Sequence, residues 1–267
     1  MDLELSSKVI IITGGNSGIG EGAARLLARE GALVVVAARR RDEGEAVAAS
    51  IRADGGEALF VACDVSEEVQ VDAVVAAALD RFGRLDGAFN NAGIELPWTD
   101  LDAATKADWD KTIAINLTGV WLCIRAQVRA MRKLGVAGSI VNCSSWQAYG
   151  GLEGGAAYCA SKAGLDGLMR AIAIETGPQG IRINNLAPGN IDTPMVRSFA
   201  PLDDPRLKPF KDLTPLKRFG SIDEIADSAA WLLSARSSFV HGETIVVDGG
   251  FGRIGGPLNP PVPLQGR

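Results

Sequence analysis

Two residues four positions apart, Tyr158 and Lys162, have the types and the spacing of an acid–base pair. On a helix, this spacing places both side chains on one face. A free tyrosine has a pKa of about 10 and transfers protons poorly at neutral pH, but a lysine one turn away favours the tyrosinate and lowers that pKa. Ser145, in a polar loop after the apolar run 139–143, adds a hydroxyl hydrogen bond. These groups can polarise and protonate a carbonyl, or reverse that reaction on an alcohol. By itself the pair also fits a surface or packing role, so the choice between catalysis and packing depends on the rest of the chain.

A glycine-rich turn near the N-terminus is a second, independent signal. The stretch 13–20 reads TGGNSGIG; it follows the β-branched run 8–12 and precedes the Ala-rich helical pattern 21–30. Glycines at these positions let the backbone approach a pyrophosphate at a helix N-terminus, where unpaired N–H groups and the helix dipole favour anions. A merely tight turn is the alternative, but the strand–turn–helix context favours a nucleotide.

Composition narrows the class of protein. Of the 267 residues, 47% are hydrophobic and 22% charged, which fits one large domain, or two small ones, with a sizeable core. The net charge of −5 argues against a nucleic-acid or acidic-membrane surface, and no apolar run approaches membrane-spanning length. The four cysteines form no CxxC pair and are expected to be buried free thiols, so we expect a cytoplasmic protein. With the single histidine His241, neither a metal site nor a histidine-based triad is expected.

Apolar β-branched runs alternate with helical patterns along the chain. Strands are predicted over 8–12, 33–38, 58–63, 85–89, 139–143, 181–186 and 243–247, and helices over 21–30, 45–53, 67–81, twice within 101–132, and over 158–176 and 221–233. This alternation predicts an α/β fold, a doubly wound sheet of about seven mostly parallel strands with helices on both faces. We expect one domain over 1–253 and a Pro-rich tail over 254–267.

Glycine or polar signals follow five of the predicted strands. They are the glycine turn, Asp64, Asn91, Ser145 and the pair Pro188 and Gly189. In doubly wound sheets, ligands bind beyond the carboxyl ends of the strands. We therefore expect these residues to meet at one site.

With these residues assembled, the chain resembles the single-domain members of the short-chain dehydrogenase/reductase family. The resemblance covers residues 5 to about 253 and rests on TGGNSGIG (13–20), NNAG (90–93), Asn116, the thirteen-residue offset from Ser145 to Tyr158, YCASK (158–162), PGNIDTPM (188–195) and VVDGG (246–250). The family implies a Rossmann-like fold and NAD(P)-dependent hydride transfer between a ketone and a secondary alcohol.

The resemblance also implies a role for each matching residue. Tyr158 is the general acid/base, Lys162 lowers its pKa and binds the nicotinamide ribose, and Ser145 orients the carbonyl oxygen. Ser144 competes for that last role, but the offset favours Ser145. Asn116 holds a water in the proton relay, with an ordinary asparagine at a helix kink as the alternative. Besides Tyr158 and Lys162, the residues expected to bind the cofactor are Gly14, Asn16, Ser17, Gly18, Ile19 and Gly20 in the turn, Arg39, Asp64, Val65 and Asn91 on the adenosine side, and Ile191 and Thr193 at the carboxamide.

The end of the second predicted strand indicates which nicotinamide cofactor binds. Ala38 stands where an acidic residue would bind a ribose 2′-hydroxyl and repel a 2′-phosphate, and Arg39, Arg40 and Arg41 follow. A guanidinium is the natural partner of a phosphate. We therefore predict NADP(H), with Arg39 as the first contact. NAD(H) is the alternative, in which the arginines form a solvated basic turn.

The substrate is less well defined by the sequence. The Pro-rich stretch 190–219 is predicted to be a loop-like lid. Candidates for an aromatic pocket wall are Trp98, Trp146 and Tyr149, which core or subunit contacts would also explain, and candidates for polar contacts are Glu95, Gln147 and Glu153. We favour a small ketone, cyclic diol or hydroxy compound as the substrate.

Three further expectations concern alternatives and assembly. One alternative function is 3-oxoacyl-[acyl-carrier-protein] reductase. Many such relatives place an arginine before the glutamate of the long helix to grip the acidic carrier, whereas Ile174 precedes Glu175 here. A non-catalytic NADP-binding sensor is a more distant alternative, since it would not need the complete proton relay. Relatives pair two long helices, and the Ala-rich pattern around 156–163 permits a similar homotetramer.

Overall fold

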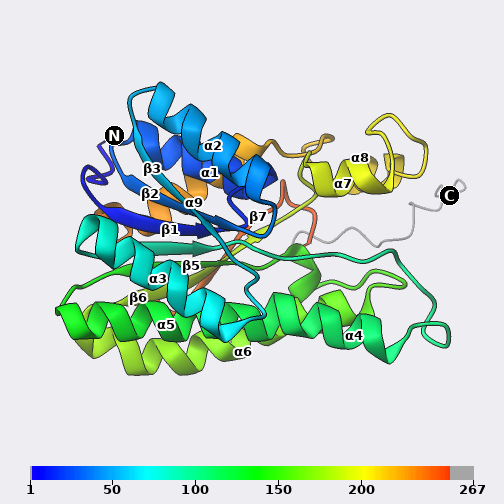
Figure 1. The fold of residues 1–267 in the computed structure, drawn as a ribbon. Coiled ribbons are helices and arrows are strands. Elements are labelled where there is room, and N and C mark those ends of the chain that lie inside the picture. The colour runs from blue at the N-terminus through cyan, green and yellow to red at the C-terminus, as the bar shows by residue number, and fades with distance from the viewer. Residues whose placement is uncertain (1, 253–267) are drawn as a thin grey trace, which may run out of the picture.

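The computed structural model describes residues 2–252, and the strands within them form one parallel sheet (Figure 1). The seven strands are β1 (Val9–Thr13), β2 (Leu33–Ala38), β3 (Glu57–Ala62), β4 (Gly87–Asn90), β5 (Ser139–Cys143), β6 (Arg182–Pro188) and β7 (Thr244–Val247). Their order is β3-β2-β1-β4-β5-β6-β7, and every pairing is parallel. The order reverses between β1 and β4, which makes the sheet doubly wound. The predicted α/β, Rossmann-like fold is confirmed. The predicted Pro-rich tail lies outside the described residues.

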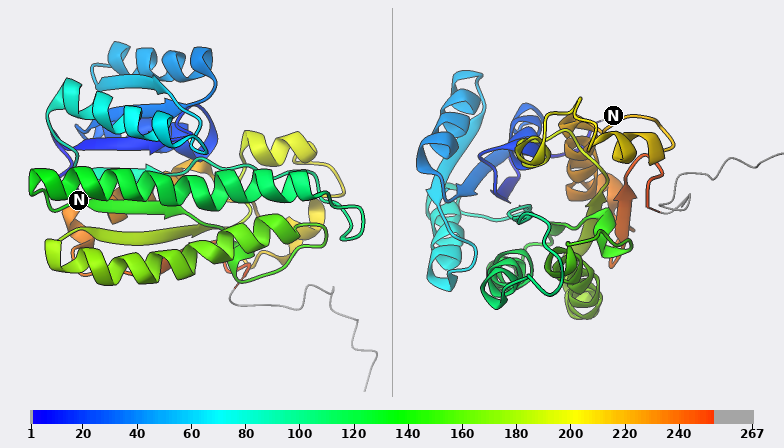
Figure 2. Two further views of the ribbon diagram at one scale, coloured as in Figure 1. Left: turned by 60° about the horizontal axis from the view of Figure 1, so that its bottom comes forward. Right: turned by 90° about the vertical axis from the view of Figure 1, so that its right-hand side faces the viewer.

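Helices cover both faces of the sheet (Figures 1 and 2). One face carries α1 (Gly18–Arg29), α2 (Arg41–Ala53) and α9 (Ile222–Leu233), and the other carries α3 (Glu68–Phe82), α4 (Lys106–Ile113), α5 (Gly119–Leu134) and α6 (Ala156–Thr176). Alternate residues of β1 enter different cores: Val9 and Ile11 pack with the side of α3, α5 and α6, while Ile10 and Ile12 pack with α1, α2 and α9. This double burial explains why the strands read as unbroken apolar runs.

Two helix boundaries differ from the predicted ones in ways that affect the site. Helix α6 begins at Ala156, two residues before the predicted start, so that Tyr158 lies inside its first turn. Helix α2 begins at Arg41 instead of residue 45, which leaves Arg39 and Arg40 in the short connection after β2. Between α4 and α5 the chain stays helical through a π-helical turn, Ala114–Thr118, which contains Asn116.

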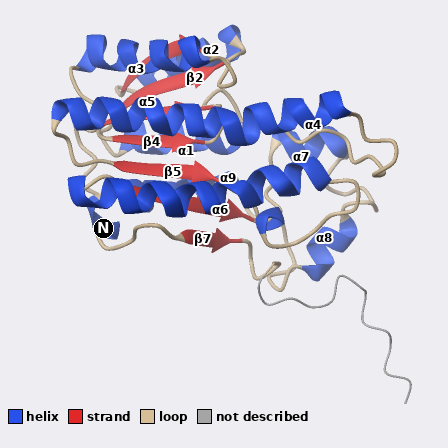
Figure 3. Cartoon of the chain, turned by 90° about the horizontal axis from the view of Figure 1, so that it is seen from below, coloured by secondary structure: helices blue, strands red, loops and turns tan. Residues whose placement is uncertain are grey.

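The 190–219 segment is less loop-like than predicted. It contains two short helices, α7 (Pro194–Phe199) and α8 (Lys208–Leu213), each with a proline in its first turn. A proline is compatible with that position, because the first N–H groups of a helix have no intrahelical partner. Both helices lie beyond the arrowheads of the strands, at the end of the sheet where a ligand is expected (Figure 3). Among residues 2–252, no helix is both long and apolar enough to cross a membrane.

Candidate active site

A cavity of about 300 Å³ opens at the carboxyl ends of the strands. Its lining comes from the glycine turn after β1, from the loops after β2, β3, β4, β5 and β6, from the start of α6 and from the 190–219 segment. The parallel topology therefore brings the polar signals of the strand ends to one place, as the sequence predicted.

The glycine turn is held in a backbone conformation that side chains would obstruct. Gly14 and Gly18 have φ angles of +65° and +57°, in the left-handed region that favours glycine. A Cβ atom on Gly20 would lie 2.3 Å from the carbonyl oxygen of Gly14. The side-chain nitrogen Nδ2 of Asn91 donates to the carbonyl oxygens of Thr13 (3.1 Å) and Gly14 (3.3 Å), which fixes the turn from the neighbouring strand. The result is a bare backbone surface at the N-terminus of α1.

Two arginines after β2 make different contacts beside this turn. Arg39 lies 3.7 Å from the carboxylate of Asp64 as an ion pair. Arg40 reaches the turn itself: its Nη2 donates to the hydroxyl of Ser17 at 3.0 Å. With the Asn16 amide turned to satisfy both groups, the oxygen of Asn16 also accepts from Arg40, at 2.7 and 3.0 Å. The guanidinium nearest the expected phosphate loop is therefore that of Arg40, which the sequence did not single out.

The predicted catalytic groups Ser145, Tyr158 and Lys162 line the same cavity. The short helical turn Trp146–Ala148 begins at Ser145, whose Oγ accepts from the backbone N–H of Gln147 at 3.2 Å. Lys162 is buried, and its Nζ donates to the carbonyl oxygen of Cys143 at 2.7 Å while lying 5.5 Å from the centre of the Tyr158 ring. Helix α6 and the end of β5 thus hold the phenol, the hydroxyl and the amine together.

The pKa of Tyr158 departs from the expectation. Burial raises the pKa of the phenol above its ordinary value and the charge of Glu95 raises it further, while the hydrogen bond with Ser145 acts in the opposite direction. Burial also lowers the pKa of Lys162, while the charges of Cys143 and Glu95 act in the opposite direction. The expected lowering of the Tyr158 pKa is therefore wrong for this arrangement, because the sequence could not show how deeply both groups are buried.

Asn116 lies behind the cavity wall and is fully buried. Its side-chain amide is paired with the backbone of Ile94 in both directions, each hydrogen bond being 2.8 Å long. Its Nδ2 also lies 3.3 Å from the hydroxyl of Ser161, on the helix that carries Tyr158 and Lys162. Asn116 therefore connects the loop after β4 to α6.

Aromatic rings form the far end of the cavity. Trp98, in the loop after β4, stacks on Phe199 of α7 with ring centres 5.3 Å apart, and it lies 5.9 Å from Phe210 of α8. Trp146 packs edge-on against Phe251 at 4.7 Å. Phe251 in turn lies 6.5 Å from Phe210, measured between ring centres, so these contacts connect the 190–219 segment to the loops after β4 and β5 and give the cavity an apolar wall.

One carboxylate lies within this apolar end. Glu95 lines the cavity, and its Oε1 accepts hydrogen bonds from the indole N–H of Trp98 and from Nε2 of Gln147, both at 3.1 Å. The other side-chain atom of Gln147, Oε1, accepts a weak bond from the thiol of Cys159 on α6 at 3.4 Å. The two polar side chains are therefore oriented by one another and by the neighbouring elements.

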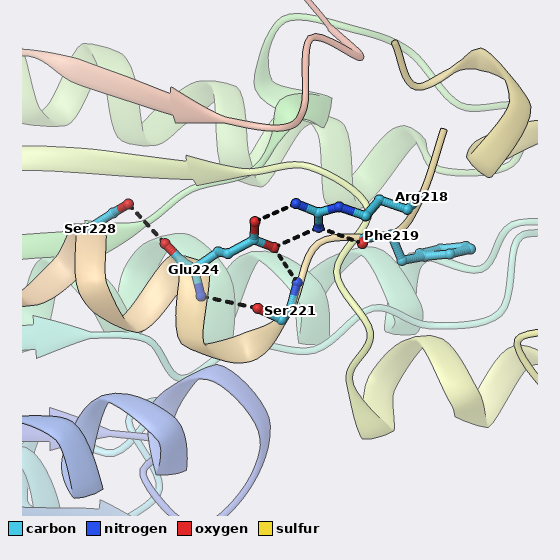
Figure 4. Close-up of polar contacts among 5 residues, drawn as sticks. All are labelled: Arg218, Phe219, Ser221, Glu224 and Ser228. Carbon is cyan, nitrogen blue, oxygen red and sulfur yellow. Dashed lines mark hydrogen bonds and ion pairs between the residues drawn. The ribbon is translucent and has the colours of Figure 1, made fainter. Parts of the chain in front are cut away.

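Backbone hydrogen bonds and an ion pair hold together the two ends of the 190–219 segment and attach them to α9. The backbone N–H of Asp192 donates to Gly220, and the N–H of Gly220 donates to Asn190, both at 2.9 Å. Next to this bridge, Arg218 makes two hydrogen bonds, of 2.6 and 2.8 Å, to the carboxylate of Glu224 at the start of α9 (Figure 4). Glu224 also forms a reciprocal cap with Ser221, so the end of the segment is fixed to the first turn of α9.

Most of the residues predicted for the site line the cavity. The exceptions are Gly20, which lies under the glycine turn, and Asn116. Of the substrate candidates, Trp98, Trp146, Glu95 and Gln147 line it, whereas Tyr149 and Glu153 do not. Lining residues that the sequence did not single out include Arg40, Asn190, Phe199 and Phe210. The arginine run and the Pro-rich segment indicated the stretches of sequence that contain these residues, but not which side chains line the cavity.

Known proteins resemble this chain over nearly its whole length. The family model described as enoyl-(acyl carrier protein) reductase matches residues 14–252. A 2,5-dichloro-2,5-cyclohexadiene-1,4-diol dehydrogenase of Sphingobium indicum is 42% identical over 94% of this chain and 99% of its own. Levodione reductase of Leifsonia aquatica is 41% identical over 92% of this chain and 94% of its own. A crystal structure of levodione reductase superposes with a TM-score of 0.87 at 40% sequence identity, covering 92% of this chain and 97% of that one. A trans-4-hydroxycyclohexanecarboxylate dehydrogenase of Sinomonas cyclohexanicum is 39% identical over 92% of this chain and 93% of its own.

The chain belongs to the short-chain dehydrogenase/reductase family. Family membership makes it an oxidoreductase that acts on CH–OH groups with a nicotinamide cofactor, and its site fits such a cofactor. The bare turn stands at the N-terminus of α1, where unpaired backbone N–H groups can bind a pyrophosphate. Asn190 also lines the cavity, and its Nδ2 is buried and has no partner among residues 2–252. A polar ligand would supply such a partner.

Proposed function

We propose that this protein is an NADP(H)-dependent oxidoreductase that interconverts a ring ketone and the corresponding secondary alcohol. The observation that supports this most directly is the juxtaposition of Tyr158, Ser145 and Lys162 with the glycine turn in one cavity. A binding protein without catalysis would have no need of a buried phenol beside that turn. The apolar far end then accommodates the carbon skeleton of the substrate.

In the proposed mechanism the nicotinamide ring of the bound cofactor supplies or accepts the hydride. Ser145 donates a hydrogen bond that orients the carbonyl oxygen, and Tyr158 delivers the proton to that oxygen in reduction or removes it in oxidation. Lys162 binds the nicotinamide ribose, and its position is set by the carbonyl of Cys143. Asn116 holds the water that links Lys162 to solvent, and its amide is kept in place by Ile94.

The raised pKa of Tyr158 gives this mechanism a pH dependence. A phenol with a raised pKa stays protonated at neutral pH, which is the form that donates a proton to a ketone. Alcohol oxidation needs the tyrosinate, so its rate rises as the pH increases toward the pKa of Tyr158. We therefore propose that the ratio of oxidation rate to reduction rate increases with pH.

The proposed substrate class is a six-membered carbocycle with a second polar group across the ring. Two of the relatives are named for such rings, a cyclohexadiene-1,4-diol and a 4-hydroxycyclohexanecarboxylate. The aromatic wall formed by Trp98, Phe199 and Phe210 suits an apolar ring. Acyl-carrier protein is not favoured as a partner, because Ile174, at the position of the carrier-gripping arginine, is 80% exposed and uncharged.

The proposed reaction can be tested by replacing the phenol. Positioned acid–base groups contribute roughly 10²- to 10⁴-fold to rate, so Tyr158→Phe should lose that factor in kcat for cyclohexanone reduction. Its affinity for NADPH, measured by fluorescence titration, should stay within twofold of the wild type. Tyr149→Phe is the matched control, since Tyr149 does not line the cavity, and it should keep full activity. Parallel loss of NADPH binding and rate in Tyr158→Phe would show that the tyrosine has another role.

We also propose that both Arg39 and Arg40 contact the 2′-phosphate of NADP(H). Charge-assisted hydrogen bonds of this kind are worth about 1.5–3 kcal/mol each, or roughly 10- to 100-fold in affinity. Arg39→Ala and Arg40→Ala should each lower the ratio of kcat/KM for NADPH over NADH by that factor. Arg41→Ala is the control, because its guanidinium lies over the ring of Phe60, 6.0 Å from the ring centre. A wild-type enzyme that uses both cofactors equally would refute this preference.

We propose a homotetramer, as in the relatives that pair their long helices. Large apolar side chains that are exposed in the single chain support further association. They include Trp109 on α4, Trp121 on α5, Ile174 on α6 and Phe239 before β7. Light scattering coupled to size-exclusion chromatography tests this, and a monomer at micromolar concentration would refute it.

A further inference from the structure

Glu95 is an anionic hydrogen-bond acceptor placed at the substrate end of an otherwise apolar wall. Both hydrogen bonds that it accepts go to one oxygen, Oε1, from Trp98 and Gln147. Among residues 2–252, no hydrogen bond to its Oε2 is formed and no lysine or arginine makes an ion pair with it. A carboxylate that is partly removed from water and paired with only two neutral donors still has capacity to accept another hydrogen bond.

The position of Glu95 relative to the reacting groups is set by Gln147. The backbone N–H of Gln147 donates to the hydroxyl of Ser145, and its side chain donates to Glu95. One residue therefore links the hydroxyl that orients the reacting oxygen to the carboxylate. The charge of Glu95 also contributes to the raised pKa of Tyr158, which agrees with this proximity.

The surroundings of Glu95 indicate what kind of group would reach it. Trp98 donates its indole N–H to Glu95 and presents its ring to Phe199 and Phe210, so the carboxylate borders an apolar surface. A ring that packs on this surface places a substituent, rather than its carbon skeleton, near the carboxylate. That substituent must be a donor, since a carboxylate only accepts hydrogen bonds, and a second carboxylate there would be repelled.

We propose that Glu95 selects substrates that carry a second, neutral hydroxyl group, from which it accepts a hydrogen bond, while Gln147 and Trp98 hold its carboxylate in place. This selection rests on the proposed function, and it narrows the proposed substrate class. The preferred substrate is a hydroxyketone or diol of a six-membered ring. A ring carboxylate, such as the substrate for which the Sinomonas relative is named, is disfavoured.

Three ketones that differ at one position test this selection. They are cyclohexanone, 4-hydroxycyclohexanone and 4-oxocyclohexanecarboxylate, each assayed with NADPH and with NADH. The variant Glu95→Gln keeps the size of the side chain and an oxygen that accepts from Gln147 and Trp98. The control variant is Glu153→Gln, which removes an exposed carboxylate that does not line the cavity.

The readout is the ratio of kcat/KM for each substituted ketone to that for cyclohexanone in the same enzyme. An effect of Glu95 on the pKa of Tyr158 acts on all three ketones and cancels from this ratio. We expect the ratio for 4-hydroxycyclohexanone to fall tenfold or more in Glu95→Gln, since a hydrogen bond to a charged group is worth roughly that factor. The ratio for 4-oxocyclohexanecarboxylate should rise, and Glu153→Gln should change neither ratio.

Two other outcomes are distinguishable. If Glu95→Gln changes the rates of all three ketones by the same factor, Glu95 acts only on the structure or on Tyr158, and the proposed selection is overturned. If the wild-type enzyme reduces none of the three ketones with either cofactor, the proposed substrate class is itself wrong.

Discussion

The two ends of the cavity are built in different ways. The end that we propose binds the nucleotide is a surface of backbone, made by one continuous stretch of eight residues, 13–20, and held by Asn91 from the loop after β4. The end that we propose binds the substrate is a surface of side chains from segments far apart in the sequence, because Trp98, Trp146, Phe199, Phe210 and Phe251 meet only in the folded protein. The backbone surface suits a group that never changes, a pyrophosphate. A surface of side chains can be changed one residue at a time, which suits a substrate that differs between relatives.

This difference predicts how each end responds to substitution. A backbone surface fails when any side chain is added beneath it, because a carbonyl group in a tight turn cannot rotate away as a side chain can. A side-chain surface loses only the contacts that one residue made, and its neighbours can repack. A single substitution at the nucleotide end should therefore cause a large loss of binding. A single substitution at the substrate end should cause a smaller loss, set by the contacts of the residue that is replaced.

The largest effect is expected at Gly20. A Cβ atom there would lie 2.3 Å from the carbonyl oxygen of Gly14 and 2.5 Å from Nδ2 of Asn91, so Gly20→Ala must displace the turn. Overpacking of this kind costs roughly 1–3 kcal/mol or more, and the displaced turn should weaken NADPH binding about 100-fold. Fluorescence titration with NADPH measures the affinity, and circular dichroism reports whether the variant is folded.

The control for this substitution is Gly151→Ala. Gly151 has no atom within 4 Å of where a Cβ would be, so the extra methyl group should leave both affinity and melting temperature nearly unchanged. A folded Gly20→Ala enzyme that binds NADPH as tightly as the wild type would contradict the idea that the backbone itself forms the phosphate surface.

An intermediate effect is expected at Trp98. Its ring contacts Phe199 of α7 and Phe210 of α8, and aromatic pairs contribute roughly 0.5–1.5 kcal/mol each beyond their buried area. Trp98→Ala should raise the KM for cyclohexanone about tenfold, while the Kd for NADPH changes less than twofold. Trp98→Phe keeps an aromatic ring but loses the N–H donated to Glu95, so its KM should stay within threefold of wild type. Equal losses in KM and in NADPH affinity would mean that the two ends of the cavity are not independent.

The sequence predicted the backbone of the glycine turn and of the strand ends well, because their determinants are local. The β-branched runs, the glycines of the turn and the polar residues after the strands each specify their own backbone, and parallel topology then brings them together. The substrate end was less predictable. The stretch that forms helices α7 and α8 was predicted to be a loop because of its prolines. Pro194 and Pro209 are compatible both with a loop and with the first turn of a helix, so they do not distinguish the two.

Two features of individual side chains could not be derived from the sequence at all. Arg39 and Arg40 are neighbours of the same type, and only the path of the chain after β2 turns Arg40 toward the glycine turn and Arg39 toward Asp64. The spacing of Tyr158 and Lys162 gave the correct face of α6 but the wrong direction of the pKa shift. That direction depends on burial under residues distant in the sequence, and Glu95 is among the groups responsible.

The smallest effect is expected at the base of the 190–219 segment, where an exposed ion pair supports the substrate end. The Arg218 guanidinium and the N–H of Ser221 hold the pKa of Glu224 down to about 2, below its ordinary value of 4.5. A lowered folded-state pKa contributes stability that is fully present above pH 4.5 and declines as the pH falls toward 2. Because the pair is exposed, Glu224→Gln should lower the free energy of unfolding at pH 7 by less than about 1 kcal/mol. Urea unfolding should show a smaller difference between variant and wild type at pH 3 than at pH 7.

The matched control separates the charge of Glu224 from the helix cap that it shares with Ser221. Glutamine retains an oxygen that can accept from the N–H of Ser221, so Glu224→Gln removes mainly the ionic contact with Arg218. Ser221→Ala instead removes the hydroxyl that accepts from the N–H of Glu224, and the roughly 1 kcal/mol that such a cap contributes should be lost to a similar extent at both pH values. A Glu224→Gln difference that persists unchanged at pH 3 would assign the stabilisation to packing rather than to charge. The ionic contact would then contribute nothing to anchoring the substrate end, and the aromatic contacts of Trp98 would remain its main support.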